Sequence, residues 1–247
     1  MKQEVVEKIL QQTSKIYETI AWNFSQTRQK PWPLLNLNQI SNYLKEGDWV
    51  LDLGCGNGRL ATMFVNLPVN YLGIDQSNEL IKIAKQQFAN QDNIKFLVGD
   101  ILKIDYQKQF DLVLLFAVLH HLPTPELRLK VLKNVYQALK PNGRLIMTNW
   151  NLWQIFAEKK FFRYFKYLFN YREKLSQGID ALSDALIPWK PLATENWRYV
   201  HSFNKKEVKK LLKQAGLIVE EIDFIKQDGS RATIFSGSNL LAIAKKK

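Results

Sequence analysis

The sequence predicts an α/β fold with a doubly wound, Rossmann-like sheet of seven strands, mostly parallel with an antiparallel last strand, and an α-helical insertion. Three observations support this fold class. Short apolar runs alternate with helical patterns over residues 49–148, as in βαβ units. A glycine-rich turn follows the first apolar run, where sheets of this kind bind ligands. The 247 residues suffice for a full α/β core, and 46% of them are hydrophobic.

The predicted strands are apolar runs that end at turn residues or acids. The run at residues 110–116 is of the kind expected in a strand covered on both faces. Pro141, Asn142 and Gly143 turn the chain into the fifth strand. The seven strands are predicted at residues 49–53, 70–74, 94–98, 110–116, 144–148, 217–224 and 239–244.

Helical periodicity and capping residues place the connecting helices. Ser77 is the predicted N-cap of one helix, and Thr124 precedes a proline and an acid at the start of another. Two prolines and several Ser, Thr and Asn residues at 22–33 are expected to break the leading helix. The helices are predicted at residues 5–20, 34–45, 59–65, 77–88, 124–139 and 205–215.

We interpret the chain as one domain over residues 1–247. Its parts are an N-terminal helical cap (1–47), a cofactor-binding core (48–150), an aromatic and basic insertion or lid (151–195) and the C-terminal part of the sheet (196–247). Rings and cations alternate at the start of the insertion. This pattern fits a helical lid packed on the core, an RNA-binding surface, or attachment to an anionic membrane face.

The formal net charge of +12 favours a polyanionic partner such as RNA, DNA or an acidic membrane face, although the three terminal lysines also fit a solubilising tail. The single cysteine, Cys55, excludes an internal disulfide framework and a cysteine-rich zinc site, and we expect no metal. No apolar run approaches the ~20 residues of a membrane span, and the N-terminus has no apolar signal core. We therefore expect a cytoplasmic protein.

The glycine-rich turn at residues 52–58 distinguishes two classes of cofactor. A dinucleotide-binding turn needs a small residue at position 59, where this chain has Arg59. The glycines fall instead at every second position, at 54, 56 and 58. Asp52 precedes them at the strand end, where its carboxylate is expected to receive the ammonium group of an amino-acid-bearing cofactor. The spacing therefore argues against NAD.

Acids also follow the second and third predicted strands. Asp75 is the expected acceptor for a ribose diol. Asp100, next to Ile101, suits an adenine amine beside an apolar contact with its ring. A single acid of this kind is more often a turn or cap residue. Acids at three successive strand ends, all at the carboxyl edge of the sheet, indicate a binding site.

These motifs, in this order, resemble those of class I S-adenosylmethionine-dependent methyltransferases. The resemblance covers residues 49–148 through the segments 50–58, 73–75, 99–101, 110–113 and 139–144. It implies S-adenosyl-L-methionine as the cofactor, with Cys55 packing in the turn rather than acting as a nucleophile. The implied cofactor-binding residues are Asp52, Gly54, Cys55, Gly56, Gly58, Asp75, Gln76, Asp100, Ile101 and Phe116.

Three further segments resemble the tRNA wobble-uridine carboxymethyl methyltransferases. They are residues 25–33, residues 117–122 followed by Arg128, and residues 198–203. The resemblance implies tRNA as the substrate and methyl transfer to the carboxylate of a modified uridine, giving a methyl ester. It also implies a possible partner, since eukaryotic and archaeal members of that family work with a small zinc-binding activator subunit.

The chemistry of the acceptor indicates the candidate catalytic residues. A carboxylate, with a pKa near ~4, is ionised at neutral pH and needs orientation rather than a base. A bidentate arginine supplies that orientation, and Arg28 is the first candidate, followed by Arg198 and Arg128. A hydroxyl or amine acceptor would instead need a base such as His120 or His121.

The residues leave two alternatives to a tRNA enzyme open. One is a small-molecule or lipid-precursor methyltransferase whose aromatic lid encloses an apolar substrate. The other is a non-catalytic binding module that retains the fold as a partner for another subunit. The intact Asp52, glycine turn, Asp75 and Asp100 argue against this second alternative.

Overall fold

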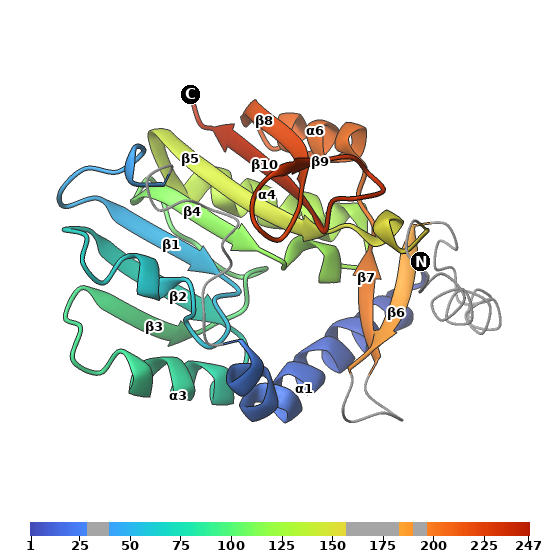
Figure 1. The fold of residues 1–247 in the computed structure, drawn as a ribbon, viewed down its shortest axis with the longest axis horizontal. Helices are drawn as coiled ribbons and strands as arrows, with labels where there is room; N and C mark the ends of the chain where they lie inside the picture. Colours follow the sequence, from blue (N-terminus) through green and yellow to red (C-terminus); the bar gives the residue numbers. More distant parts are fainter. Residues whose placement is uncertain (29–39, 157–182, 190–196) are drawn as a thin grey trace.

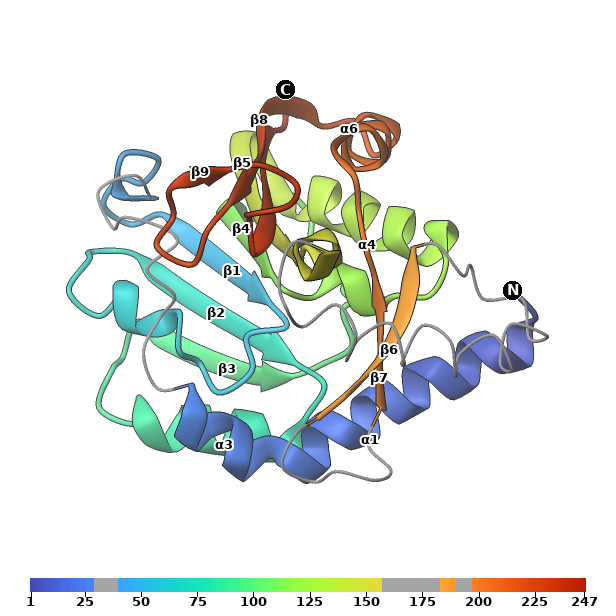
Figure 2. The same ribbon diagram turned by 45° about the vertical axis from the view of Figure 1, so that its right-hand side comes forward.

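The computed structural model describes residues 1–28, 40–156, 183–189 and 197–247. A twisted central sheet lies between helices, and α1 (Gln3–Thr27) runs past the carboxyl ends of its strands (Figure 1). α4 (Pro125–Ala138) and α6 (Lys205–Gln214) cover one face of the sheet, and α3 (Asn78–Gln87) covers the other (Figure 2). The predicted doubly wound α/β fold is confirmed.

The main sheet contains the seven predicted strands and one more. Its members are β1 (Trp49–Leu53), β2 (Asn70–Asp75), β3 (Ile94–Val98), β4 (Phe110–Phe116), β5 (Leu139–Trp150), β8 (Ile218–Ile225), β9 (Arg231–Ala232) and β10 (Asn239–Lys245). They are ordered β3-β2-β1-β4-β5-β10-β8-β9, and β10 is antiparallel to both β5 and β8. The unpredicted β9 forms because the chain turns back after β8, where Lys226 N donates to the carbonyl of Ser230.

Side chains alternate between two cores along the central strands. In β4, Val113 and Leu115 face α4 and α6, whereas Leu112 and Leu114 belong to the core beneath α3. The apolar run of β4 is therefore buried on both faces, as predicted. This double cover keeps the strands in register and so holds the loops at their carboxyl ends in place.

The predicted caps of two helices are confirmed. The Ser77 hydroxyl accepts a hydrogen bond from the backbone N–H of Leu80 at the start of α3. The Thr124 hydroxyl accepts one from the N–H of Leu127 at the start of α4, with Pro125 in the first turn. These caps fix the residues at which α3 and α4 begin, and so where the preceding loops end.

Helix α1 is longer than predicted. The break expected over residues 22–33 does not occur before Thr27, and Arg28 forms the C-cap. The buried stripe of the helix continues through Ala21 and Ser25. The Thr27 hydroxyl bonds back to the carbonyl of Asn23, so the polar residues are accommodated within the helix.

Two other predicted helices differ from the structure. The helix predicted at residues 59–65 is wrong, because the described chain forms only a short 3-10 turn, η1 (Ala61–Met63), there. The N–H of Ala61 bonds to the carbonyl of Gly58, which sets the tighter i→i−3 pattern. Of the helix predicted at 34–45, residues 34–39 lie outside the described chain, and the helical conformation ends at Ser41.

A helical insertion was predicted at residues 151–195, but residues 184–188 of that segment form a strand instead. After a 3-10 turn, η3 (Leu152–Phe156), the described chain resumes in β6 (Asp184–Pro188). This strand pairs antiparallel with β7 (Trp197–His201) in a separate two-stranded sheet. β7 packs against α1 (Figure 2), so the hairpin reaches the carboxyl edge of the main sheet. Residues 157–182 lie outside the described chain.

Candidate functional site

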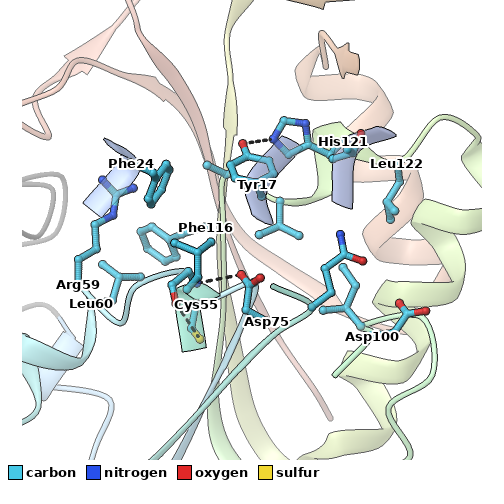
Figure 3. A pocket seen from close by; sticks show the side chains of 18 of the residues that line it. Tyr17, Phe24, Cys55, Arg59, Leu60, Asp75, Asp100, Phe116, His121 and Leu122 are labelled. Atoms are coloured by element: carbon cyan, nitrogen blue, oxygen red, sulfur yellow. Dashed lines mark hydrogen bonds between the residues drawn. The ribbon is translucent and has the colours of Figure 1, made fainter. Parts of the chain in front are cut away.

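A cavity of about 340 Å³ lies at the carboxyl ends of β1 to β4 and is bordered by α1 (Figure 3). It sits at the topological switch point, where β2 and β4 flank β1. Its volume falls within the range of roughly 300–1,000 Å³ typical of small-molecule sites. The predicted residues that line it are Arg28, Gly54, Cys55, Gly56, Asp75, Gln76, Asp100, Ile101 and Phe116.

The glycine turn after β1 forms one wall of the cavity. Gly54 has φ +73°, and a Cβ atom there would lie 2.3 Å from the side chain of Val118. The N–H groups of Gly54 and Cys55 both donate to the carbonyl of Ile74, which fixes the turn against β2. Gly58 faces the core instead, because a Cβ there would lie 2.8 Å from the ring of Phe96. It does not line the cavity as predicted.

Asp75 ties the glycine turn to the start of α3. One carboxylate oxygen accepts from the N–H of Gly56 and the other from the N–H of Ser77, each at 2.9 Å. Burial raises the pKa of Asp75, opposed by these hydrogen bonds. Gln76 lines the cavity beside it. Asp75 therefore presents an acceptor whose position is fixed by backbone groups on two elements.

Asp100 and Ile101 lie in the loop after β3, beside the same cavity (Figure 3). The Asp100 carboxylate accepts from the N–H of Leu102 at 2.9 Å, which orients it in the loop. Ile101 and Leu102 add apolar wall next to this acid. A polar group beside apolar surface is suited to the recognition of a flat, amine-bearing ring.

Asp52 lies beneath the glycine turn and does not line the cavity. Its carboxylate accepts a hydrogen bond from the Tyr71 hydroxyl at 2.5 Å, and its other oxygen is buried without a hydrogen bond in the described chain. Burial raises the pKa of Asp52 to about 7. Asp52 therefore reaches the cavity only through the glycine turn above it, because its carboxylate is turned toward Tyr71.

Arg28, which lines the cavity, and Arg198, which does not, both lie against Trp189. The guanidinium carbons of Arg28 and Arg198 lie 4.6 Å and 4.8 Å from the ring centroid of Trp189. Arg198 also lies 5.0 Å from the ring centroid of Trp150, which lines the cavity. Neither arginine has a carboxylate partner in the described chain. Burial, reinforced by the charge of Arg198, lowers the pKa of Arg28.

Arg28 is tied to the glycine turn through its backbone. Asn57 Nδ2 donates to the Arg28 carbonyl at 3.1 Å, and the Arg28 guanidinium donates to the Thr27 hydroxyl at 2.9 Å. The C-terminal end of α1 is thus joined to the loop that forms the opposite wall. Uncompensated positive charge at this end of the cavity favours an anionic ligand.

His121 lines the cavity and is fully engaged in hydrogen bonds. Its Nδ1 donates to the carbonyl of Tyr199 at 2.8 Å, so its Nε2 accepts from the Tyr17 hydroxyl at 2.9 Å (Figure 3). Burial, together with the charge of Arg198, lowers the pKa of His121 to about 3. The acceptor nitrogen that a base would use is already occupied.

His120 and Arg128 lie outside the cavity, contrary to their predicted roles at the acceptor. His120 is fully buried, accepts from the backbone N–H of Trp150, and has its pKa lowered well below the usual value by burial. Arg128 is 2% exposed and is turned away from the cavity, toward α6. Its guanidinium donates to Glu207, Tyr199 and the Leu122 carbonyl, so it joins α4 to α6 and β7.

Sequence reasoning missed the contribution of α1 and of the β6–β7 hairpin. Tyr17 and Phe24 project from α1 into the cavity wall, and Arg59 lines it beside the glycine turn (Figure 3). Burial and the charge of Arg28 lower the pKa of Arg59 to about 10. Trp189, between the two arginines, had no local signal. For α1, the aromatic residues in its amphipathic sequence were the hint that the helix lies over the cavity.

The described residues contain no cluster of three His, Cys, Asp or Glu side chains suited to a metal ion. Among the helices described, none is long and apolar enough to cross a membrane. Cys55 is buried, and burial raises the pKa of its thiol well above the usual value, as expected for a packing residue.

A glycine turn and successive acids at the switch point of a doubly wound sheet define an α/β protein that binds a nucleoside-containing cofactor. A family model described as a methyltransferase domain matches residues 44–216. The chain belongs to this family and is a class I S-adenosylmethionine-dependent methyltransferase.

Similar curated proteins carry a more specific name. The tRNA (carboxymethyluridine(34)-5-O)-methyltransferase of Saccharomyces cerevisiae is 30% identical over 190 residues, which cover 75% of this chain and 59% of the relative. The protein of the same name from Schizosaccharomyces pombe is 29% identical over 226 residues, covering 82% of this chain and 86% of the relative. The chain therefore spans about three fifths of the budding-yeast protein.

Solved structures share the fold at lower identity. A SAM-dependent methyltransferase from Methanosarcina mazei has a TM-score of 0.66 and 23% identity, covering 84% of this chain and 96% of that one. A Haloferax volcanii methyltransferase, solved in complex with the Trm112 methyltransferase activator, has a TM-score of 0.61 and 17% identity. In that case the coverage is 94% of this chain and 96% of the other.

The cavity fits S-adenosyl-L-methionine, the cofactor of this family. Gly54 and Gly56 leave the backbone bare on one wall, so a ligand can approach it closely. Asp75 and Asp100 place acceptors after β2 and β3, and Phe116 adds apolar surface at the end of β4. These features match a molecule with an amino-acid chain, a ribose and an adenine ring. When bound, the cofactor supplies a methyl group on a positively charged sulfur.

Proposed function

We propose that this methyltransferase acts on the carboxylate of a carboxymethyl-type wobble uridine in tRNA. The observation that carries the proposal is the pairing of Arg28 and Arg198 around Trp189, without a carboxylate partner in the described chain. The names of the yeast relatives, at about 30% identity, support the same acceptor.

The cofactor is assigned to the half of the cavity formed by the strand ends. Asp75 accepts from the ribose diol, Gln76 lies beside it, and Asp100 with Ile101 receives the adenine ring. The glycine turn and Phe116 enclose the amino-acid end. Asp52 acts from beneath the turn, where a buried, partly unsatisfied carboxylate gives the wall a negative charge when ionised.

The acceptor carboxylate is assigned to the two arginines. Two guanidinium groups held near one ring repel each other, and the ring face offsets only part of that repulsion. A bound carboxylate supplies the missing negative charge and can accept paired N–H bonds from a guanidinium. Since Asn57 ties Arg28 to the glycine turn, the acceptor and the cofactor are positioned by one connected segment.

The acceptor needs no base, and this agrees with the state of the histidines. A carboxylate is already ionised at neutral pH, so no proton has to be removed from it. A hydroxyl or amine acceptor would need a free basic nitrogen within hydrogen-bond reach. His121 uses both ring nitrogens in other hydrogen bonds, and His120 does not line the cavity. These observations disfavour the alternative of a small-molecule O-methyltransferase.

The proposal extends to an activator subunit as a partner. The Haloferax volcanii structural neighbour was solved with such an activator. In this chain β3 is an edge strand of the described sheet, and Leu97 and Val98 at its end are 47% and 50% exposed. An exposed apolar edge is suited to pairing with a strand of another protein. Co-expression with a candidate activator, followed by purification through one tagged partner, tests this point.

Nucleoside mass spectrometry of tRNA from cells with and without the gene tests the acceptor. The proposal expects carboxymethyl-type uridine to accumulate, and its methyl ester to disappear, when the gene is deleted. Incubation of that tRNA with purified protein and S-adenosyl-L-methionine should restore the ester. The proposed acceptor is wrong if the nucleoside profile does not change on deletion.

A further inference from the structure

Six lysines on α4 and α6 form an exposed basic surface with no assigned role. None of them makes a hydrogen bond, ion pair or ring contact in the part of the chain that the structure describes. The neighbouring Lys205 differs, since it pairs with Asp223 at 2.6 Å. The exposed lysines, which we call the α4–α6 lysine face, are Lys130, Lys133, Lys206, Lys209, Lys210 and Lys213.

The two helices bring these lysines together. Near their starts, Arg128 of α4 contacts Glu207 of α6 at 3.3 Å. Near their ends, Tyr136 of α4 lies against Gly216, where a Cβ would come within 3.1 Å of its ring. The two helices therefore lie next to each other over one face of the sheet. Lysines on both helices lie between these two contacts.

Acids offset only part of this charge, since α4 and α6 together carry two acids against the six lysines, and the exposed one, Glu126, lies four residues before Lys130 at the start of α4. Glu207, the acid within α6, turns inward to Arg128 and His201. Along α6, Lys206 and Lys210 are four residues apart, as are Lys209 and Lys213, and like charges at that spacing destabilise a helix. A polyanion bound along these α6 lysines would relieve the repulsion between them. The stripe from 206 to 213 is about 10 Å long, over which a nucleic-acid strand carries about three phosphates.

The lysine face is close to the acceptor end of the cavity along the chain. β7 carries Arg198 at that end and leads through His201 into α6 at Lys205. Lys205 lies seven positions after Arg198 along the chain, so the two are at most about 25 Å apart. A nucleotide held at Arg198 and a helical stem on the lysine face can therefore belong to one RNA.

We propose that the α4–α6 lysine face binds the phosphate backbone of a helical stem of tRNA while the modified base occupies the cavity. This inference rests on the proposed function, because it takes tRNA as the substrate. Binding through backbone phosphates is independent of sequence, as is usual for RNA helices. In this binding mode the stem lies on the face of the sheet covered by α4 and α6, and not on the face covered by α3.

The test compares two matched double variants. Lys209→Gln/Lys213→Gln removes two charges from the lysine face, and Lys82→Gln/Lys85→Gln removes two exposed charges from α3. Lysine and glutamine have similar helix propensities, so both variants should fold. Binding of tRNA is measured by fluorescence anisotropy across a range of KCl concentrations, and methyl transfer to tRNA is measured at varied tRNA.

The α6 variant should bind tRNA about tenfold more weakly at low salt, with a logarithmic salt slope shallower by about 1 to 2. Its KM for tRNA should rise while kcat and cofactor affinity stay unchanged, and the α3 variant should match the wild type. Equal behaviour of the two variants would overturn the proposal. The proposal would also be overturned if the α6 variant lost binding to phosphatidylglycerol–phosphatidylcholine vesicles but kept its binding to tRNA. That result would indicate a membrane-binding surface.

The two proposals fail in different ways. If the wild type forms no methyl ester on tRNA, yet the α6 variant still loses tRNA affinity, then the acceptor is wrong and the binding surface stands. If ester forms with the same KM in both variants, the acceptor stands and the lysine face is wrong. A wild-type protein that does not bind tRNA at all contradicts both.

Discussion

The Tyr17 hydroxyl donates a hydrogen bond to His121 Nε2 across 2.9 Å and so joins α1 to the segment after β4. The same histidine donates from Nδ1 to the carbonyl of Tyr199, which extends the link to β7. Three elements distant in sequence are therefore held together at one wall of the cavity. This hydroxyl is one of the contacts that hold α1 over the cavity.

Tyr17→Phe should lower the free energy of unfolding by about 1 to 3 kcal/mol, because it leaves the buried Nε2 of His121 without a donor. Methyl transfer should also slow, since α1 carries Arg28 at its end. Urea unfolding and initial rates measure the two effects. Tyr106→Phe is the control, because its hydroxyl has no hydrogen bond in the described chain. Equal stability of the two variants would contradict the structural role of Tyr17.

Arg28→Ala should reduce methyl transfer by about a hundredfold or more, while cofactor affinity stays within a few-fold. Arg28→Lys should recover little activity, because an ammonium group lacks the paired N–H geometry of a guanidinium. Initial rates and calorimetric titration with S-adenosyl-L-methionine separate the two effects. Arg231→Ala, at an exposed arginine, is the control. Parallel loss of cofactor affinity would mean that Arg28 was misassigned.

Asp75→Ala should weaken cofactor binding by about tenfold to a hundredfold. The substitution removes the proposed ribose acceptor and also the carboxylate that holds the N–H groups of Gly56 and Ser77. Calorimetric titration gives the dissociation constant, with Asp92→Ala as a matched variant at an exposed acid. An unchanged dissociation constant would rule out the ribose role.

His201 should make stability depend on pH. Its Nδ1 and Nε2 donate to Asp184 and Glu207 at 2.7 Å and 2.8 Å, and an imidazole with two donors is protonated. Burial lowers the pKa of His201, but the hydrogen bonds to the two acids outweigh it and leave the pKa raised. The network couples this titration to β6, β7 and α6.

The sign of this pH effect follows from the raised pKa. Because the folded protein binds the His201 proton more tightly than the unfolded chain, the stabilisation is complete below pH ~6.5 and is lost as the pH rises through the folded pKa. Urea unfolding at pH 6 to 9 should show this decline, and His201→Gln should remove that part of it. A His201→Gln variant with the wild-type pH profile would contradict the prediction.

The sheet and the glycine turn were predictable because their signals are local. The apolar run at residues 110–116 predicts a strand covered on both faces, and the Gly54 turn needs a conformation that its own residue type permits. The capping hydroxyls of Ser77 and Thr124 act within three residues of their partners. Such short-range preferences can be read from neighbouring residues alone.

The proposed acceptor end of the cavity was predictable only in part. Arg28 and Arg198 were candidates from the sequence, and the structure brings both to Trp189. Arg128 was a candidate on similar grounds, yet it pairs with Glu207 in the structure. No local pattern distinguishes these arginines, because the difference lies in which distant segment each one meets. The position of β6 beside β7 was missed for the same reason.

The sequence by itself determined the fold class, the position of the cofactor turn and the acids at successive strand ends. These follow from periodicity and backbone requirements that act over a few residues. Only the tertiary structure decided which residues lie together around Trp189, since Tyr17, Arg28 and Trp189 meet through contacts between distant segments. It also decided that Asp52 lies under the turn, because Tyr71 on the adjacent strand takes its carboxylate. Contacts of this kind depend on the packing of the whole sheet.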